Sequence, residues 1–284
     1  MGVGVAQGYQ LTTFLYGLWA GKRNLPAQPA AAHRGAPRAW ALGSEEGPVL
    51  LADQHVAHQM DATTCGSTAI ALAMASDPTT QPSGEPADAL RSFSTFAQRQ
   101  REVKELTNAR RGVFSWPDRL GTAPWGAARV MKFQGHDYFD RMVVDTSLPQ
   151  SSRLLTHAAH CAERGYPVLL YVGGDTTMGW NKGVPRHVVV LHSPPQRPRD
   201  VLEENSTSGA SELELDPKLV ALAQQIHVKL NQVKAESFDP ELMIFDPASG
   251  NNTRVRLGQL IDGKAPREAC GGWPHIMWAV MPKP

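Results

Sequence analysis

The sequence predicts an α+β protein, in which helices dominate the first half of the chain and short strands dominate the second. Apolar residues recur at helical spacing in the first half, whereas short β-branched runs bounded by turn residues mark the second. The chain shows no internal repeat, and its 284 residues are ample for a sizeable core. This segregation of helices from strands is typical of α+β architecture.

Five helices are expected from the helical periodicity. The first starts at about Cys65, and the second carries an apolar stripe of Leu90, Phe93, Phe96, Ala97, Val103 and Leu106. The later helices are expected after turn and cap residues, which favour helix starts. The second helix is expected from Ala87 to Ala109, with Pro86 in its first turn, and the third from a cap at Thr122 through Met131. The fourth is expected from caps at Ser151 and Ser152 through Glu163, with Gly165 as the C′ residue, and the fifth from Asp216 to about Ala235.

Strands are expected where short apolar or β-branched runs lie between turn residues. The runs PVLLYV and HVVVL are typical of strands that are buried on both faces. The expected strands are 138–145, 167–172, 187–191, 242–245, 254–257 and 276–280.

Composition divides the chain into an arm and one domain. A stretch rich in Pro, Ala and Gly predicts an extended or flexible N-terminal arm over residues 1–48. One folded domain is expected over residues 49–284, interrupted by a polar insertion rich in Pro and Ser at about 193–240.

Charge and hydropathy exclude several partner classes. Lys plus Arg (28) nearly balances Asp plus Glu (27), which disfavours nucleic-acid binding by bulk charge. No apolar run approaches the ~18–20 residues that span a bilayer, and the short run 11–20 lacks the basic residues of a standard signal peptide. Three widely spaced cysteines suit a reducing compartment. A cytoplasmic location, or secretion by a route without a standard signal peptide, is therefore expected; the oligomeric state is open.

Cys65 is the leading candidate for chemistry. It follows Asp61, Thr63 and Thr64, which are cap-type residues, so it is expected in the first turn of its helix. There, the positive end of the helix dipole and unpaired backbone N–H groups favour the thiolate, which is the nucleophilic form. A small buried thiol is an equally good interpretation of this stretch alone.

A cysteine nucleophile needs a base and a group that orients the base. His187 opens the strand HVVVL, where an imidazole can project into a cleft, although a core histidine is the alternative. Asp246 ends the strand LMIF before Pro247, an arrangement that also occurs in purely structural turns. If these two strands pair, Asp246 comes beside His187 and can orient the ring. Gln59, six residues before Cys65, can aim an amide N–H at an oxyanion, with the Cys65 backbone N–H as the second donor.

These residues, in this order, resemble the papain-like cysteine peptidases, and most closely their bacteriocin-processing branch, which acts on double-glycine leaders. The resemblance rests on Gln59 ahead of Cys65-Gly66-Ser67, on His187 followed by three valines, and on the run 245–250 (FDPASG), and it covers about residues 50–280. It implies a papain-like fold in which a helical N-terminal half, with the Cys65 helix, packs on a C-terminal antiparallel sheet. It also implies Cys65 as nucleophile, His187 as base, Asp246 as orienting residue and Gln59 as oxyanion donor.

The expected function is a cysteine-dependent hydrolase that cleaves a peptide or isopeptide bond through an acyl-enzyme, with a protein or peptide as substrate. A deamidase or acyl transferase of the same fold, or a non-catalytic binding or effector module, are the alternatives. No cofactor or metal is expected, since the pair His157 and His160 beside Cys161 has no evident third ligand nearby.

Overall fold

The computed structural model describes residues 45–80, 87–108, 116–143, 149–179, 182–194 and 238–283. Within them, one twisted antiparallel sheet of eight strands has the order β1-β7-β6-β5-β4-β8-β3-β2. The strands are β1 (Gly47–Pro48), β2 (Lys132–Phe133), β3 (His136–Met142), β4 (Val168–Gly173), β5 (Pro185–His192), β6 (Glu241–Asp246), β7 (Asn251–Arg256) and β8 (His275–Pro282).

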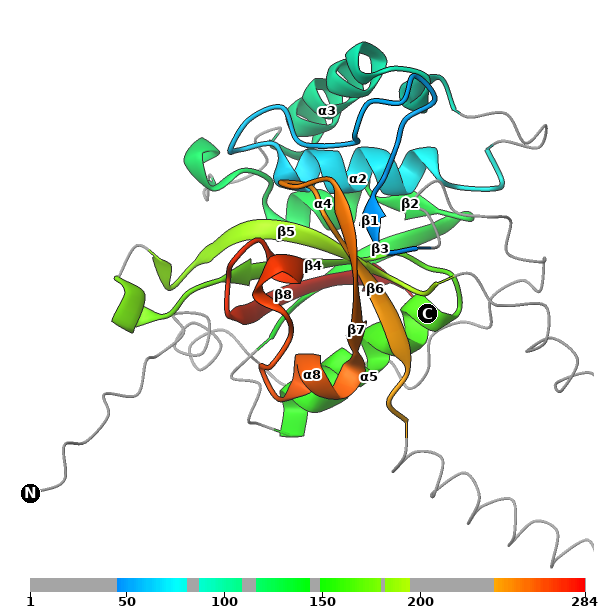
Figure 1. Ribbon diagram of the computed structural model, residues 1–284. Coiled ribbons are helices and arrows are strands. Elements are labelled where there is room, and N and C mark those ends of the chain that lie inside the picture. The colour runs from blue at the N-terminus through cyan, green and yellow to red at the C-terminus, as the bar shows by residue number, and fades with distance from the viewer. Residues whose placement is uncertain are drawn as a thin grey trace, which may run out of the picture.

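Helices cover both faces of this sheet (Figure 1). On one side lie α2 (Cys65–Ala75), α3 (Phe93–Asn108) and α4 (Pro124–Val130); on the other lie α5 (Pro149–Glu163) and α8 (Leu257–Ile261). Short 3₁₀ turns join them: η1 (Asp88–Leu90), η2 (Asp118–Leu120), η3 (Thr176–Met178) and η6 (Arg267–Cys270). The predicted α+β class is confirmed.

The middle of the sheet is buried on both faces. Every residue of β4 is buried, as are six of the eight residues in the neighbouring β8 and seven of the eight in β5. This explains why their sequences are nearly continuous apolar runs rather than alternating ones. The Cys65 helix packs against β5, as expected, but β2 and β3 come from the first half of the chain, so the sheet is not wholly C-terminal.

Helix α2 is enclosed on all sides because its side chains are small. Ten of its eleven residues are buried, and five of the eleven are Ala or Gly. At its start, a Cβ on Gly66 would lie 2.6 Å from Cβ of Thr122, so the segment before α4 packs directly against the helix. Small residues thus let the layers approach closely around Cys65.

Several element boundaries differ from those expected. The second helix begins at Phe93 rather than Ala87, because Oδ2 of Asp53 accepts the Phe93 N–H at 2.9 Å and Ser92 shares reciprocal hydrogen bonds with Thr95. On that helix Leu106 is 52% exposed and does not belong to the buried stripe.

Four further elements have boundaries that shift by a few residues. The helix expected from caps at 151 and 152 starts at Pro149, and the short helix near 124 is preceded by Ala123, not by a Thr122 cap. The strand expected over 138–145 spans His136–Met142, and β7 ends at Arg256 because Leu257 opens α8. Gly165 ends α5 at a φ of 82°, in the left-handed region expected of a C′ glycine.

The predicted arm and insertion lie mostly outside the described residues. Residues 1–44 and 195–237 are not described, and these include the helix expected from 216 to 235. Gly47 and Pro48, which the prediction placed in the arm, pair with Asn252 and Asn251 of β7. In the described part of the chain, no helix combines the length and the hydrophobicity required to cross a bilayer.

Candidate active site

Cys65 is the first residue of α2, which confirms its expected place at a helix start. The preceding Thr64 is the N-cap, but its side chain makes no cap hydrogen bond among the described residues; its hydroxyl instead accepts the Asp61 N–H at 3.0 Å. The hydroxyls of Ser67 and Thr68 donate to the Thr64 carbonyl oxygen, at 3.0 and 2.7 Å. The thiol therefore sits at the positive end of the dipole of an almost entirely buried helix.

His187 and Asp246 form a buried pair. They lie on the neighbouring strands β5 and β6, which pair antiparallel through Val190 and Phe245. Nε2 of His187 lies 2.5 Å from Oδ1 of Asp246, and the two side chains are only 7% and 5% exposed. The expectation that these strands pair and bring Asp246 beside His187 is confirmed.

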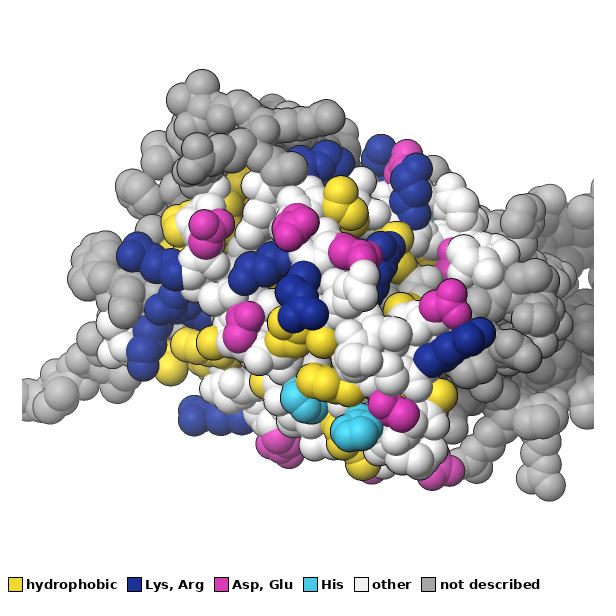
Figure 2. Space-filling model, turned by 90° about the horizontal axis from the view of Figure 1, so that it is seen from above, with side chains coloured by type: hydrophobic (Ala, Val, Ile, Leu, Met, Phe, Trp, Pro, Cys, Tyr) yellow, Lys and Arg dark blue, Asp and Glu magenta, His cyan; other side chains and the backbone are white. Residues whose placement is uncertain are grey.

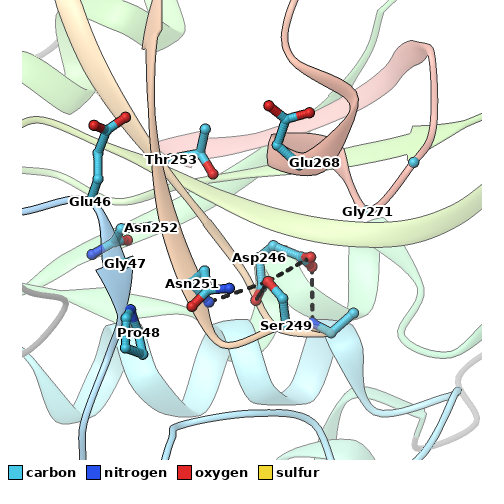
Figure 3. A pocket seen from close by; sticks show the side chains of 12 residues that line it. Glu46, Gly47, Pro48, Asp246, Ser249, Asn251, Asn252, Thr253, Glu268 and Gly271 are labelled. Carbon is cyan, nitrogen blue, oxygen red and sulfur yellow. Dashed lines mark hydrogen bonds between the residues drawn. The ribbon is translucent and has the colours of Figure 1, made fainter.

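The turn after β6 fixes the Asp246 carboxylate. Oδ1 accepts the N–H of Ala248 at 2.9 Å, and Oδ2 accepts the hydroxyl of Ser249 at 3.0 Å (Figure 3). Pro247 supplies a rigid φ in the same turn. Three donors thus converge on one carboxylate, which locks its orientation toward the imidazole.

His187 has two neighbours that matter for its charge. Nε2 lies against Asp246, so Nδ1 takes no part in that bond, and Cys65 is near enough to the ring to affect its pKa. Burial by itself lowers the pKa of His187, but the bonds and charges of Asp246 and Cys65 outweigh burial and raise it to about 9. Burial raises the pKa of Asp246, yet the bond to His187, its charge, the Ala248 N–H and the Ser249 hydroxyl together lower it.

This arrangement favours a protonated His187 at neutral pH. A histidine with a pKa of about 9 holds its proton at pH 7, and a neighbouring carboxylate stabilises that charge. The ring can then give the proton to a leaving group after the sulfur has attacked. Cys65, His187 and Asp246 thus have the mutual geometry of a nucleophile, a base and an orienting group.

Gln59 lies beside the turn that carries Asp246. Its backbone N–H donates to the carbonyl oxygen of Pro247 at 2.8 Å. Its side-chain Oε1 is buried and has no hydrogen-bond partner among the described residues. Oε1 is an acceptor and can take a hydrogen bond from a substrate N–H, whereas the oxyanion role requires the Nε2 donor of the same amide.

Sequence reasoning missed two neighbours of the site. Gly271, at a φ of 58°, lies against the imidazole: a Cβ there would come within 2.6 Å of Cδ2 of His187. The sequence feature that could have marked this close contact is the glycine pair Gly271-Gly272, which follows η6. Tyr171 is the second neighbour, since burial and the nearby Cys65 raise the pKa of its hydroxyl well above 10.

A pocket of about 850 Å³ opens beside Asp246 (Figure 3). Asp246, Ser249 and Gly271 contribute to its wall, with Glu46 and Glu268 at its edge. Neither Cys65 nor His187 lines it. The pocket therefore adjoins the candidate triad on the Asp246 side and not at the nucleophile.

The other two cysteines differ from Cys65 in their surroundings. Burial raises the thiol pKa of Cys161 to about 12, and burial together with the charge of Asp246 raises that of Cys270 to about 12. Both are therefore protonated and poorly nucleophilic at neutral pH.

The described part of the chain contains no group of three or more side chains suited to hold a metal, and burial lowers the pKa of His157 and His160.

Comparison of the chain with models of protein families, with curated protein sequences and with solved structures gives no match.

Proposed function

We propose that this protein is a cysteine-dependent hydrolase of the papain-like class that cleaves a peptide or isopeptide bond. The Cys65 thiolate attacks the carbonyl carbon, and Gln59 and the Cys65 backbone N–H stabilise the oxyanion. His187 protonates the leaving amine, and water then hydrolyses the acyl-enzyme. Asp246 holds the imidazole in the productive orientation.

One observation carries this proposal: Nε2 of His187 lies 2.5 Å from the buried carboxylate of Asp246, and Cys65, at the start of α2, is near enough to the same ring to raise its pKa. A purely structural histidine needs one satisfied nitrogen, and the Asp246 bond already supplies it. The site combines a thiol at a helix start with a buried imidazole and a buried carboxylate. This combination supports a catalytic role more strongly than a role in packing alone. The fold is compatible with the proposal at the level of its class, because helices cover an antiparallel sheet and the candidate nucleophile lies on the helix that meets β5.

The test is incubation of the full chain with a diverse peptide library, followed by mass spectrometry. New peptide termini in the presence of the wild type, and none with Cys65→Ala, are the expected result. A mass gain at glutamine without chain cleavage indicates a deamidase that uses the same residues. The absence of any Cys65-dependent product overturns the proposal and favours a binding or effector module.

A further inference from the structure

The loop that leads into the nucleophile is attached to helix α3 by a buried glutamine. Nε2 of Gln100 donates to the carbonyl oxygen of His58, and Oε1 of Gln100 accepts the N–H of Met60, both at 3.0 Å. Gln100 has no exposed surface. The residue held between these two bonds is Gln59, the candidate oxyanion donor.

Gln100 stands where an apolar residue is the ordinary choice. It lies on the buried face of α3, between Phe96 and Val103, which are also fully buried. Burying an amide costs free energy unless both its donor and its acceptor are satisfied. In Gln100, the amide donor and the amide acceptor are both satisfied by backbone groups on either side of Gln59. Gln100 therefore specifies the path of the loop that contains Gln59.

From the other side, the same loop is held by the Asp246 turn. The N–H of Gln59 donates to Pro247, and a Cβ on Gly250 would come within 2.3 Å of Cγ1 of Val56. The backbone of Gln59 is thus fixed between α3 and the turn that orients His187. Any shift of this backbone moves the Gln59 amide relative to Cys65.

A second attachment lies one turn further along α3. Lys104 donates to the hydroxyl of Thr63, and that hydroxyl donates to Oδ1 of Asp61 at 2.6 Å. The acidic and basic side chains over this layer are intermixed (Figure 2). Helix α3 therefore holds the loop at two levels, at 58–60 and at 63.

We propose that Gln100 is a positioning residue for catalysis: by clamping His58 and Met60, it fixes the Gln59 amide where the oxyanion develops. This inference rests on the proposed function. A preorganised donor stabilises the oxyanion only if it is held in place before reaction, and a misplacement of about 1 Å costs on the order of 10²-fold in rate.

The test compares two reactions of the same sulfur. With p-nitrophenyl acetate, the sulfur bonds to the acetyl carbon, an oxyanion forms, and the C–O bond to p-nitrophenolate breaks, which releases that anion; water later hydrolyses the thioester to acetate and the free thiol. With iodoacetamide, the sulfur displaces iodide from a CH₂ group and no oxyanion forms. Only the first reaction requires Gln59.

Four variants of the full chain are compared with the wild type. Gln100→Met keeps the length of the side chain and removes both bonds. Gln100→Glu keeps the acceptor for Met60 and the shape of the side chain, and it keeps a donor for the His58 carbonyl oxygen only when its carboxyl is protonated. Gln59→Ala removes the donor itself. Gln98→Met, two residues earlier on the exposed face of α3, is the matched control.

The expected result is a split between the two rates. Gln100→Met slows acylation of Cys65 by about 10- to 100-fold, and Gln100→Glu slows it less, while alkylation changes by less than about threefold. Gln98→Met changes neither rate. If the Gln100 variants slow both reactions equally, or neither, while Gln59→Ala slows acylation alone, the inference is overturned and the proposed function stands. If wild-type Cys65 is not acylated at all, the inference about Gln100 and the proposed function are both overturned.

Discussion

Replacing Asp246 by Asn tests how the carboxylate controls His187. The structure allows this change with little displacement: Oδ1 of the new amide can still accept from His187 and from the Ala248 N–H, while its NH₂ donates to the hydroxyl oxygen of Ser249. The orientation of the ring is retained and only the negative charge is lost. The expected effect is therefore electrostatic.

The size of the effect follows from the hydrogen bond. A bond to a charged group contributes about 1.5–3 kcal/mol and a neutral one about 0.5–1.5 kcal/mol, so the charge contributes roughly 1–1.5 kcal/mol to the imidazolium. At 1.36 kcal/mol per pKa unit, the pKa of His187 falls by about one unit from its wild-type value. That wild-type value is about 9.

The assay is a histidine side-chain NMR titration, with the His187 resonance assigned by its loss in His187→Gln. Asp175→Asn is the matched control, because Asp175 bonds Nε2 of His275 at 3.0 Å at the same end of the sheet without touching His187. The control leaves the titration of His187 unchanged. A wild-type His187 that titrates near 6.5, or one that Asp246→Asn does not move, refutes the reasoning.

Three further outcomes are expected. Gly66→Ala forces its Cβ to within 2.6 Å of Thr122 and destabilises the fold by about 1–3 kcal/mol in denaturant unfolding; unchanged stability contradicts the close packing of α2. The folded-state pKa of His187 is about 9 and the ordinary pKa of a histidine is 6.5, so its contribution to stability, roughly 3.4 kcal/mol at most, is complete below pH 6.5 and is lost as the pH rises through 9; the melting curves of wild type and His187→Gln should therefore converge over that interval. Gly271→Ala places a Cβ 2.6 Å from the His187 ring and should slow alkylation of Cys65 while Gly272→Ala, whose Cβ meets nothing within 4 Å, does not.

The sequence predicts the positions of Cys65, His187 and Asp246 on their elements because its signals are local. A thiol after cap-type residues marks a helix start, and polar residues at the ends of apolar runs mark strand ends. His187 and Asp246 are 59 residues apart, yet the pairing of their two strands is enough to bring them together. The α+β class follows from the same periodicity.

What the sequence does not predict depends on contacts between distant segments. Helix α3 starts at Phe93 because Asp53, 40 residues earlier, caps it. The role of Gln100 requires knowing that the loop at 58–60 crosses its helix, and the role of Gly271 requires knowing that η6 packs on His187. Periodicity identifies a face of a helix, but it does not identify the segment that covers it.

The most direct measurement of the central claim is the alkylation rate of each cysteine by iodoacetamide near neutral pH, followed by peptide mass spectrometry of the native protein. Cys65 should be labelled fast, whereas Cys161 and Cys270, whose thiol pKa values are raised to about 12, remain unlabelled over the same period. His187→Ala should abolish the fast labelling of Cys65. Slow and equal labelling of all three cysteines in the wild type would contradict a catalytic Cys65.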